Sequence, residues 1–173
     1  STIAHADGQL NIYNWSDYIA EDTIANFEAE TGISVTYDMY DSNEVLEAKM
    51  MAGSSGYDLV VPTGDFLARG REAGVYADID MARLSNIGNQ DRQVQGLADS
   101  QMADTKAGIV YMWGTTGVAY NVEMVKERLG DDAPTDSWSL ILDPANAAKL
   151  ADCGIAILDA PTDVLPNVIA YQG

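Results

Sequence analysis

Apolar and polar residues follow two distinct rhythms over the first part of the chain. Residues 10–13 place apolar side chains at alternate positions, which is typical of a strand. Residues 21–31 space their apolar side chains at helical intervals, with Ile24 and Phe27 on one face. The chain therefore opens with a predicted strand followed by a predicted amphipathic helix.

The same order of strand and helix returns from residue 33 onward. Residues 33–37 alternate apolar and polar side chains and predict a second strand. Asp41 and Glu44 have the spacing of a capping box, the side-chain pair that satisfies the first backbone N–H groups of a helix. We therefore expect a second helix to begin at this point, with Leu46 and Met50 facing inward.

A third unit completes this part of the chain. Residues 57–61 form a nearly continuous apolar run that predicts a buried strand, and residues 65–73 follow as a helix. The three predicted helices end at glycines, Gly32, Gly53 and Gly74. Repeated strand–helix units predict right-handed crossovers and a mostly parallel sheet with helices on both faces. Ligands bind such sheets beyond the carboxyl ends of the strands, which points to loops 14–20, 40–42 and 62–66.

The remainder of the chain has a less regular pattern. Residues 80–106 are polar, with one helix expected over residues 91–98. Two further stretches have strand-like composition, residues 109–121 and 154–158. Three further helical stretches are predicted: residues 122–129, residues 137–150 as one or two helices broken at Pro144, and residues 162–171. A change of domain is expected near residue 110.

Composition and charge narrow the classes of function. The chain has 173 residues, 47% of them hydrophobic, and 27 acidic residues against nine basic ones give a formal charge of −18. This composition is that of a folded, water-soluble protein, and the charge repels nucleic acid and anionic membranes. Apolar runs are far shorter than the ~20 residues that a membrane span needs. The acidity fits either attraction of a cationic partner or a solvated surface.

Residues that support catalysis are scarce. The single histidine, His5, lies in the N-terminal tail, and Cys153 is the single cysteine. No nucleophile elbow, phosphate-binding glycine loop or zinc-protease motif is present. We therefore expect no enzyme activity, no cofactor and no metal site, and a buried, inert thiol at Cys153. Residues 4–6 have the small-x-small form of a signal-peptidase site, which would mean export.

One loop collects candidate binding chemistry at the end of the first predicted strand. Trp15, Asp17 and Tyr18 place two aromatic rings and an acid within four residues. The rings either cover the sheet edge or form a wall for a cation, since ring faces attract ammonium groups by roughly 0.5 to 2 kcal/mol. A buried ammonium also needs carboxylates nearby, because its lost hydration costs several kcal/mol.

Six stretches of the chain carry a likeness to a known family: residues 11–19, 37–53, 57–62, 111–117, 136–138 and 158–161. In these stretches the sequence resembles the periplasmic polyamine-binding proteins of bacterial ABC importers, and the putrescine-binding branch most. The resemblance runs in order from residue 10 to the last residue.

The resemblance implies an α/β fold, the two-lobed type II periplasmic binding protein with mostly parallel sheets covered by helices. On this expectation residues 1–110 are lobe one, without its C-terminal return segments. Residues 111–117 are the hinge crossing, and residues 118–173 are the start of an incomplete lobe two. The resemblance also implies a disulfide partner for Cys153 in a C-terminal half that this chain lacks. Self-association is expected to cover the exposed edges.

The resemblance further implies a ligand site between the lobes. Its expected residues are Trp15, Ser16, Asp17, Tyr18, Thr63, Asp65 and Asp163. Trp15 and Tyr18 would be aromatic walls, Ser16 would hydrogen-bond near an amine, and Asp17 would lie at the rim.

Three of these positions depart from the family pattern or vary within it. Thr63 replaces a frequent serine as a polar contact, and Asp163 stands where glutamate is common, as the carboxylate from the second lobe. Asp65 lies where members differ between ligands, so it would either favour a third amine or face solvent.

The function implied is capture of a polyamine, putrescine in the first instance, and its delivery in the periplasm to the membrane permease of an ABC importer. Another cationic solute, such as spermidine or agmatine, is the alternative ligand. A sensory polyamine receptor module is the alternative role.

Overall fold

The computed structural model describes residues 8–101 and 107–173. These residues belong to two compact units, Ser1–Trp113 and Gly114–Gly173, which are described separately below. The boundary falls inside the stretch predicted as the hinge crossing, although the assignment of lobes and hinge stays a prediction. His5 and the signal-peptidase-like residues 4–6 lie outside the described residues.

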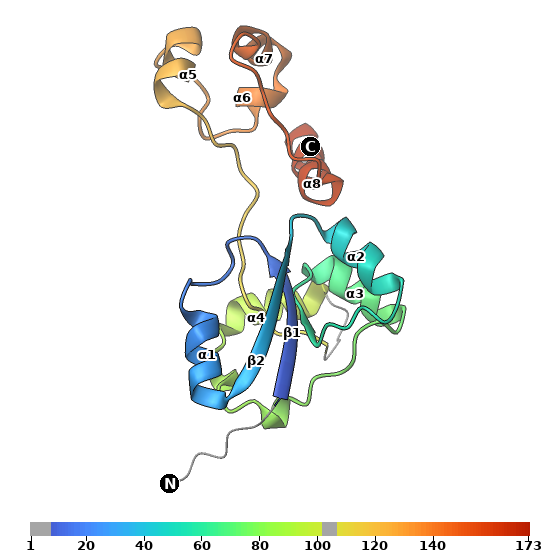
Figure 1. Ribbon diagram of the computed structural model, residues 1–173. Coiled ribbons are helices and arrows are strands. Elements are labelled where there is room, and N and C mark those ends of the chain that lie inside the picture. Colours follow the sequence, from blue (N-terminus) through green and yellow to red (C-terminus); the bar gives the residue numbers. More distant parts are fainter. Residues whose placement is uncertain (1–7, 102–106) are drawn as a thin grey trace. The chain divides into compact units, whose positions relative to one another are not determined.

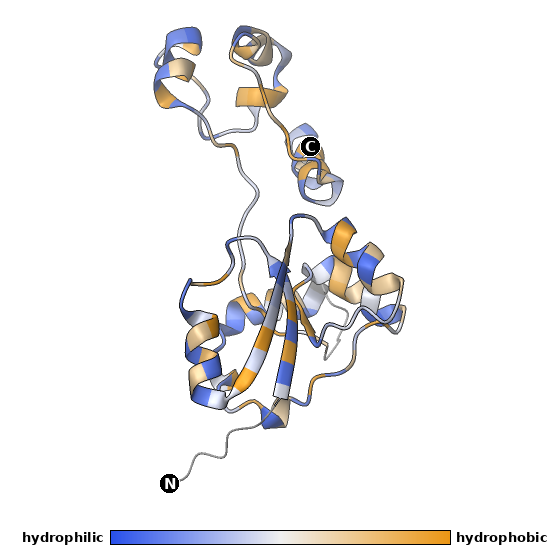
Figure 2. Cartoon of the chain, in the orientation of Figure 1, coloured by the Kyte–Doolittle hydropathy of each residue, from blue (hydrophilic) through white to orange (hydrophobic). Residues whose placement is uncertain are grey.

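The first unit is built on a parallel sheet of three strands in the order β2-β1-β3 (Figure 1). β1 (Gly8–Trp15) pairs with β2 (Ile33–Tyr40) along its whole length, and β3 (Leu59–Val60) pairs with the other edge of β1. Hydrophobic and hydrophilic bands alternate along β1 and β2 in Figure 2. The predicted α/β class with a parallel sheet is confirmed.

Three helices connect and follow these strands, as the sequence predicts. They are α1 (Thr23–Thr31), α2 (Asn43–Met51) and α3 (Gly64–Glu72). Figure 1 shows α1 on one side of the strands and the α2–α3 pair on the other, as the crossovers of a 2-1-3 order require. Gly32 ends α1 in the left-handed region at a φ of 74°, which glycine adopts without a steric penalty.

The predicted capping box at the start of α2 is wrong by one residue. The N-cap is Ser42, whose hydroxyl accepts a hydrogen bond from the Val45 backbone N–H at 3.2 Å. β2 continues to Tyr40, three residues beyond the predicted end, so Asp41 belongs to the connecting bend and lies too early to cap the helix.

The third predicted strand is shorter and less buried than expected. Only Leu59 and Val60 pair with β1, and Leu59 is 50% exposed. The preceding residue is tied to β1 differently: the Asp58 backbone N–H donates to the Asn11 carbonyl at 2.9 Å, and its carboxylate accepts from the Asn11 N–H at 2.8 Å. A strand at the edge of the described sheet has one neighbour, so a continuous apolar run does not guarantee burial.

Aromatic residues dominate the core of the first unit. Tyr13, Tyr40 and Leu46 are buried, and four half-buried side chains pack against them: Trp15, Met50, Tyr57 and Val60. The inward placement predicted for Leu46 and Met50 is therefore confirmed. The Tyr13 and Tyr57 rings stack at 4.6 Å, nearly parallel.

The rest of the first unit is short helices and irregular segments. Two 3₁₀ turns, η1 (Met81–Arg83) and η2 (Ile87–Asn89), precede α4 (Arg92–Gln101). α4 confirms the helix predicted near residues 91–98. The Asp91 carboxylate accepts hydrogen bonds from the Gln93 and Val94 backbone N–H groups, which satisfies two donors of the first turn.

The second unit is helical in its regular elements. Its helices are α5 (Val122–Leu129), α6 (Ser139–Leu142), α7 (Pro144–Leu150) and α8 (Pro161–Gln172), as the sequence predicts. Pro144 separates α6 from α7 by opening the latter, where its missing N–H costs no hydrogen bond. Val125, Leu140 and Leu150 form the buried core of this unit.

Two predicted strands are absent from the described structure, and the predicted burial of the Cys153 thiol is wrong. Residues 109–121 and 154–158 form no strand in the described structure, and Ile157 and Leu158 are 60% and 68% exposed. No described strand is hydrogen-bonded to either stretch, and an extended segment becomes a strand only beside a partner. Cys153 lies in the exposed turn after α7, so its thiol is exposed rather than buried.

Candidate ligand-binding site

The three strands end at one edge of the sheet because they are parallel. β1 ends at Trp15 beside the end of β2 at Tyr40, and the Ser16 backbone N–H donates to the Tyr40 carbonyl at 3.2 Å. The loops that leave this edge are the three that the sequence places at the carboxyl ends. Six of the seven expected ligand residues lie at or beside these strand ends: Trp15 ends β1, Ser16, Asp17 and Tyr18 follow it, Thr63 precedes α3 and Asp65 lies in the first turn of α3.

Trp15 is half-buried and held from two sides. Its indole Nε1–H donates to the Val61 carbonyl at 2.8 Å, and its ring centroid lies 4.6 Å from that of Tyr40. The Tyr18 ring lies 6.1 Å from Trp15 at 39°, and Tyr18 is 41% exposed. The two predicted aromatic walls are thus neighbours, and Tyr18 faces solvent.

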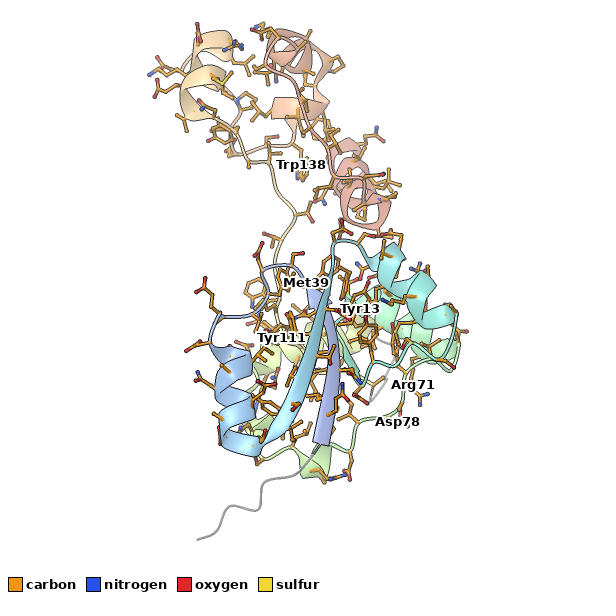
Figure 3. The ribbon with its side chains drawn as sticks, in the orientation of Figure 1. Tyr13, Met39, Arg71, Asp78, Tyr111 and Trp138 are labelled. Atoms are coloured by element: carbon orange, nitrogen blue, oxygen red, sulfur yellow. The ribbon has the colours of Figure 1, made fainter. Side chains whose placement is uncertain are left out.

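The two polar residues between these rings lie on a tight turn. Ser16 and Asp17 are exposed, and Asp17 adopts a φ of 61°. Left-handed backbone is uncommon for residues other than glycine, although aspartate tolerates it better than most. The Tyr111 hydroxyl, whose residue is labelled in Figure 3, donates to the Tyr18 carbonyl and ties segment 107–113 to this turn.

Thr63 and Asp65 form a second polar group at the start of α3. The Thr63 hydroxyl donates to the Asp65 carboxylate at 2.7 Å. The Thr63 backbone N–H donates to the side-chain oxygen of Asn43, which is buried. Asp65 is exposed in the first turn of α3, where the helix dipole favours a negative charge.

Asp163 belongs to the second unit and lies in the first turn of α8. Its side chain is exposed at the surface of that unit, and its backbone carbonyl accepts a hydrogen bond from the Asn167 amide at 2.8 Å.

The buried residues that hold Trp15 and its strand end in place were not identified in the sequence analysis. Tyr40 is buried at 4% exposure, and its hydroxyl donates to the Val61 carbonyl. Tyr40 follows Ser34, Thr36 and Asp38 at two-residue steps along β2, and these three residues are exposed. Alternation alone therefore predicts that Tyr40 faces solvent, whereas it is buried. Burial raises the pKa of the Tyr40 hydroxyl above its ordinary value, because it disfavours the ionised form.

Asn14 is a second missed supporting residue. It is 3% exposed, its amide donates to the Tyr37 hydroxyl at 2.9 Å, and its oxygen accepts from the Trp15 backbone N–H at 2.8 Å. This role follows from burial that only the structure shows, because a buried polar side chain has to find hydrogen-bond partners.

Other parts of the described structure offer less chemistry for a cation. A shallow hollow of about 410 Å³ lies at the opposite end of β1 and β2, lined by Gly8, Gln9, Gly32 and Ser34. Its lining contains no aromatic or acidic side chain. Within residues 8–101 and 107–173, no group of three or more histidine, cysteine, aspartate or glutamate side chains could hold a metal ion.

Comparison with known protein families shows which class of protein this chain belongs to. Residues 22–168 match the family described as bacterial extracellular solute-binding protein. The chain therefore belongs to this family, and the fold class predicted from the sequence agrees with it.

Particular relatives confirm the resemblance to putrescine-binding proteins. The putrescine-binding periplasmic protein PotF of Escherichia coli (strain K12) is 53% identical over 99% of this chain and 46% of its own length. The putrescine-binding periplasmic protein SpuD of Pseudomonas aeruginosa (strain UCBPP-PA14) is 50% identical over 95% of this chain and 45% of its own. The chain thus spans about half the length of these relatives.

A solved structure agrees with these sequence matches. It is the structure of a protein proposed to be a spermidine/putrescine ABC transporter, from Listeria monocytogenes, with a TM-score of 0.69 and 34% identity over 79% of this chain and 40% of that one. The expected periplasmic localisation agrees with the family description and with both sequence relatives, which are periplasmic proteins. In the part of the chain that is described, no helix is both long and apolar enough to cross a membrane.

Proposed function

We propose that this chain is the ligand-capturing part of a periplasmic binding protein that takes up a polyamine, putrescine in the first instance, and delivers it to the membrane permease of an ABC importer. The observation that carries the proposal is the identity of 53% and 50% with two putrescine-binding proteins. The chemistry of the strand-end loops supports it. No catalytic step is part of this function.

The proposed ligand contacts divide between apolar and charged parts of the diamine. Putrescine has a short methylene chain with an ammonium at each end, so its middle would lie against Trp15 and Tyr18. Ring faces attract the ammonium ends, and the carboxylates of Asp17, Asp65 and Asp163 would offset their lost hydration. Ser16 and Thr63 would add hydrogen bonds. The formal charge of −18 supports attraction of a divalent cation at long range.

Selection by ligand length follows from this arrangement. A ligand with one more amine must lose the hydration of another charge, and without a matching acid this loss exceeds the gain from added apolar contact. Asp65 is the residue that would supply such an acid. A stronger preference for spermidine than for putrescine would assign Asp65 to a third amine.

Delivery would require a change between open and closed arrangements of two lobes. We place the crossing at residues 111–117, as the sequence resemblance implies. The ligand would favour the closed form by its higher affinity for that form, and the closed face would be recognised by the permease.

Isothermal titration of the chain with putrescine tests the proposal. Trp15→Ala is expected to weaken binding at least tenfold, because the ring contact and its burial of methylenes are lost. The role of the Asp163 charge is tested by comparing Asp163→Asn with Asp132→Asn. The second substitution removes the same charge in the exposed turn after α5. Asp163→Asn should weaken binding and Asp132→Asn should not. If the heat of putrescine binding is unchanged in the double variant Trp15→Ala, Asp163→Ala, the proposed site is refuted.

Self-association is the remaining part of the proposal. The second unit exposes several large apolar side chains, Ile157, Leu158, Leu165 and Ile169 among them. Pairing of two chains would remove this surface from water, and salt should promote it by screening the acidic charge. Light scattering measures the mass, and a value of 18.6 kDa at all salt concentrations would contradict association.

A further inference from the structure

One backbone carbonyl joins the two aromatic residues at the strand ends. The Val61 carbonyl accepts a hydrogen bond from the Trp15 indole at 2.8 Å and another from the Tyr40 hydroxyl. A carbonyl oxygen has two lone pairs, so it can accept both donors at once. The two side chains come from neighbouring strands, and the carbonyl comes from the residue directly after β3. All three strands of the sheet are therefore connected through this oxygen.

The Tyr40 ring is itself fixed by packing. It is 4% exposed, and its centroid lies 4.8 Å from that of Tyr13, whose ring stacks on Tyr57. Its centroid also lies 4.6 Å from that of Trp15, at an interplanar angle of 53°. Tyr40 thus joins a rigid aromatic cluster to the side chain that the proposed function places against the ligand.

We propose that Tyr40 is a positioning residue for ligand recognition, which fixes the orientation of the Trp15 indole through the shared Val61 carbonyl and the contact between the two rings. The ligand part of this inference rests on the proposed function, whereas the part that concerns the indole orientation does not. Tyr40 itself is buried and is not assigned a ligand contact.

The physical effect is pre-organisation. A tryptophan side chain has two rotatable bonds, and a half-buried indole without fixed partners would have to become ordered when the ligand binds. The Val61 carbonyl and the Tyr40 ring restrict both rotations before the ligand arrives, so less freedom is lost on binding. Removal of the Tyr40 hydroxyl should therefore weaken binding about three- to tenfold, the range expected for one hydrogen bond.

Tyr40→Phe isolates the hydroxyl, because it keeps the ring. Replacement of Trp113 and Trp138 by phenylalanine leaves Trp15 as the single tryptophan, so that fluorescence reports on its indole alone. The matched control is Tyr57→Phe, which removes a hydroxyl bonded to Asp38 and Lys49 in the same aromatic cluster. Time-resolved anisotropy should show a larger amplitude of fast indole motion in Tyr40→Phe than in Tyr57→Phe or the parent. Equal amplitudes in all three proteins would overturn the proposal.

The ligand readout is titration of the same three proteins with putrescine. We expect the Kd to rise about three- to tenfold in Tyr40→Phe and to stay within twofold in Tyr57→Phe. A second comparison uses Trp15→Phe, which has no indole N–H. In that background Tyr40→Phe should weaken binding no more than Tyr57→Phe does, and a further weakening would contradict action through Trp15.

The two readouts separate this inference from the proposed function. If the parent protein does not bind putrescine, the proposed function fails, and the anisotropy comparison still decides whether Tyr40 orders Trp15. If the parent binds and Tyr40→Phe binds equally well with an equally ordered indole, the proposed function stands and the role of Tyr40 fails.

Discussion

The two units of the chain differ in how their apolar residues are used. In the first unit, two of the three paired strands supply Tyr13 and Tyr40 to a buried core, α2 supplies Leu46, and the strand ends carry aromatic and acidic side chains. In the second unit, helices bury a small cluster around Leu140, while Ile157 and Leu158 are largely exposed.

The difference arises because a helix forms from neighbouring residues alone, whereas a strand needs a partner strand from elsewhere in the chain. A helix satisfies its own backbone hydrogen bonds, so the helices form in both units. A parallel strand forms only beside a partner strand, and its side chains are buried only where other elements cover the faces of the sheet. The apolar run 154–158 has no such partner in the described structure and remains irregular. Single substitutions can therefore measure how independent and how well packed the two units are.

The largest effect is expected from truncation of the core leucines. Leu46 and Leu140 are each 1% exposed, one in each unit. Alanine at either position should cost about 2–5 kcal/mol of stability, because it removes buried apolar surface and leaves a cavity. Hydrogen exchange should show Leu46→Ala accelerating amides of β1, β2 and α2, and Leu140→Ala accelerating those of α5 and α7. Equal acceleration in both units by either variant would contradict separate cores.

A glycine in α3 tests how tightly the first unit is packed. A Cβ at Gly70 would clash with the Tyr76 ring, whereas one at Gly96 in α4 would meet nothing within 4 Å. Gly70→Ala should destabilise by about 1–3 kcal/mol through overpacking, and Gly96→Ala should stabilise by up to about 1 kcal/mol through helix propensity. Urea unfolding measures both. Effects of the same sign would contradict the close contact at Gly70.

Helix capping should give a smaller and equal effect in both units. The Ser42 hydroxyl accepts from the Val45 N–H at 3.2 Å, and the Asn121 side chain accepts from the Met124 N–H at 3.0 Å. Alanine at either cap should cost about 1 kcal/mol. Exchange rates of the first-turn amides provide the measurement. The interpretation of Ser42 as the cap fails if Asp41→Ala accelerates the α2 amides and Ser42→Ala does not.

The smallest effect concerns an ion pair at the surface of the second unit. The Asp152 carboxylate accepts two hydrogen bonds from the Arg128 guanidinium, at 2.8 and 2.7 Å. These bonds lower the pKa of Asp152 from an ordinary value near 4 to about 2. The stabilisation is therefore present above pH 4 and is lost as the pH falls from about 4 to 2. An NMR titration should show the pKa of Asp152 rising in Arg128→Gln. The matched variant Arg71→Gln, which breaks the Arg71–Asp78 pair of the first unit (Figure 3), should leave it unchanged.

Much of the fold could be predicted from local sequence signals. Helical periodicity and terminal glycines located the helices, and the strand–helix order predicted the parallel sheet. The start of α2 was misplaced because Tyr40 extends β2, and only pairing with Trp15 on β1 reveals that extension. The strands expected at residues 109–121 and 154–158 were wrong because residue pattern does not supply a partner strand.

The site was predictable to the level of its loops and not of its supports. The rule that ligands bind at the carboxyl ends of parallel strands placed Trp15 and Thr63 at one edge. The roles of Tyr40 and the Val61 carbonyl depend on contacts between residues that are far apart in sequence, so no local pattern announces them. The contribution of each ligand residue, including Asp163, stays a prediction.

The indole N–H signals of the three tryptophans test the central claim most directly, in a nitrogen-15-labelled chain titrated with putrescine. Trp15, Trp113 and Trp138 each give one signal, so the titration compares the proposed site with two other positions in the same sample. The account predicts that the Trp15 signal shifts saturably and by more than the other two. A Trp15 signal that does not move at saturating putrescine, or that moves less than the signals of Trp113 and Trp138, would contradict it.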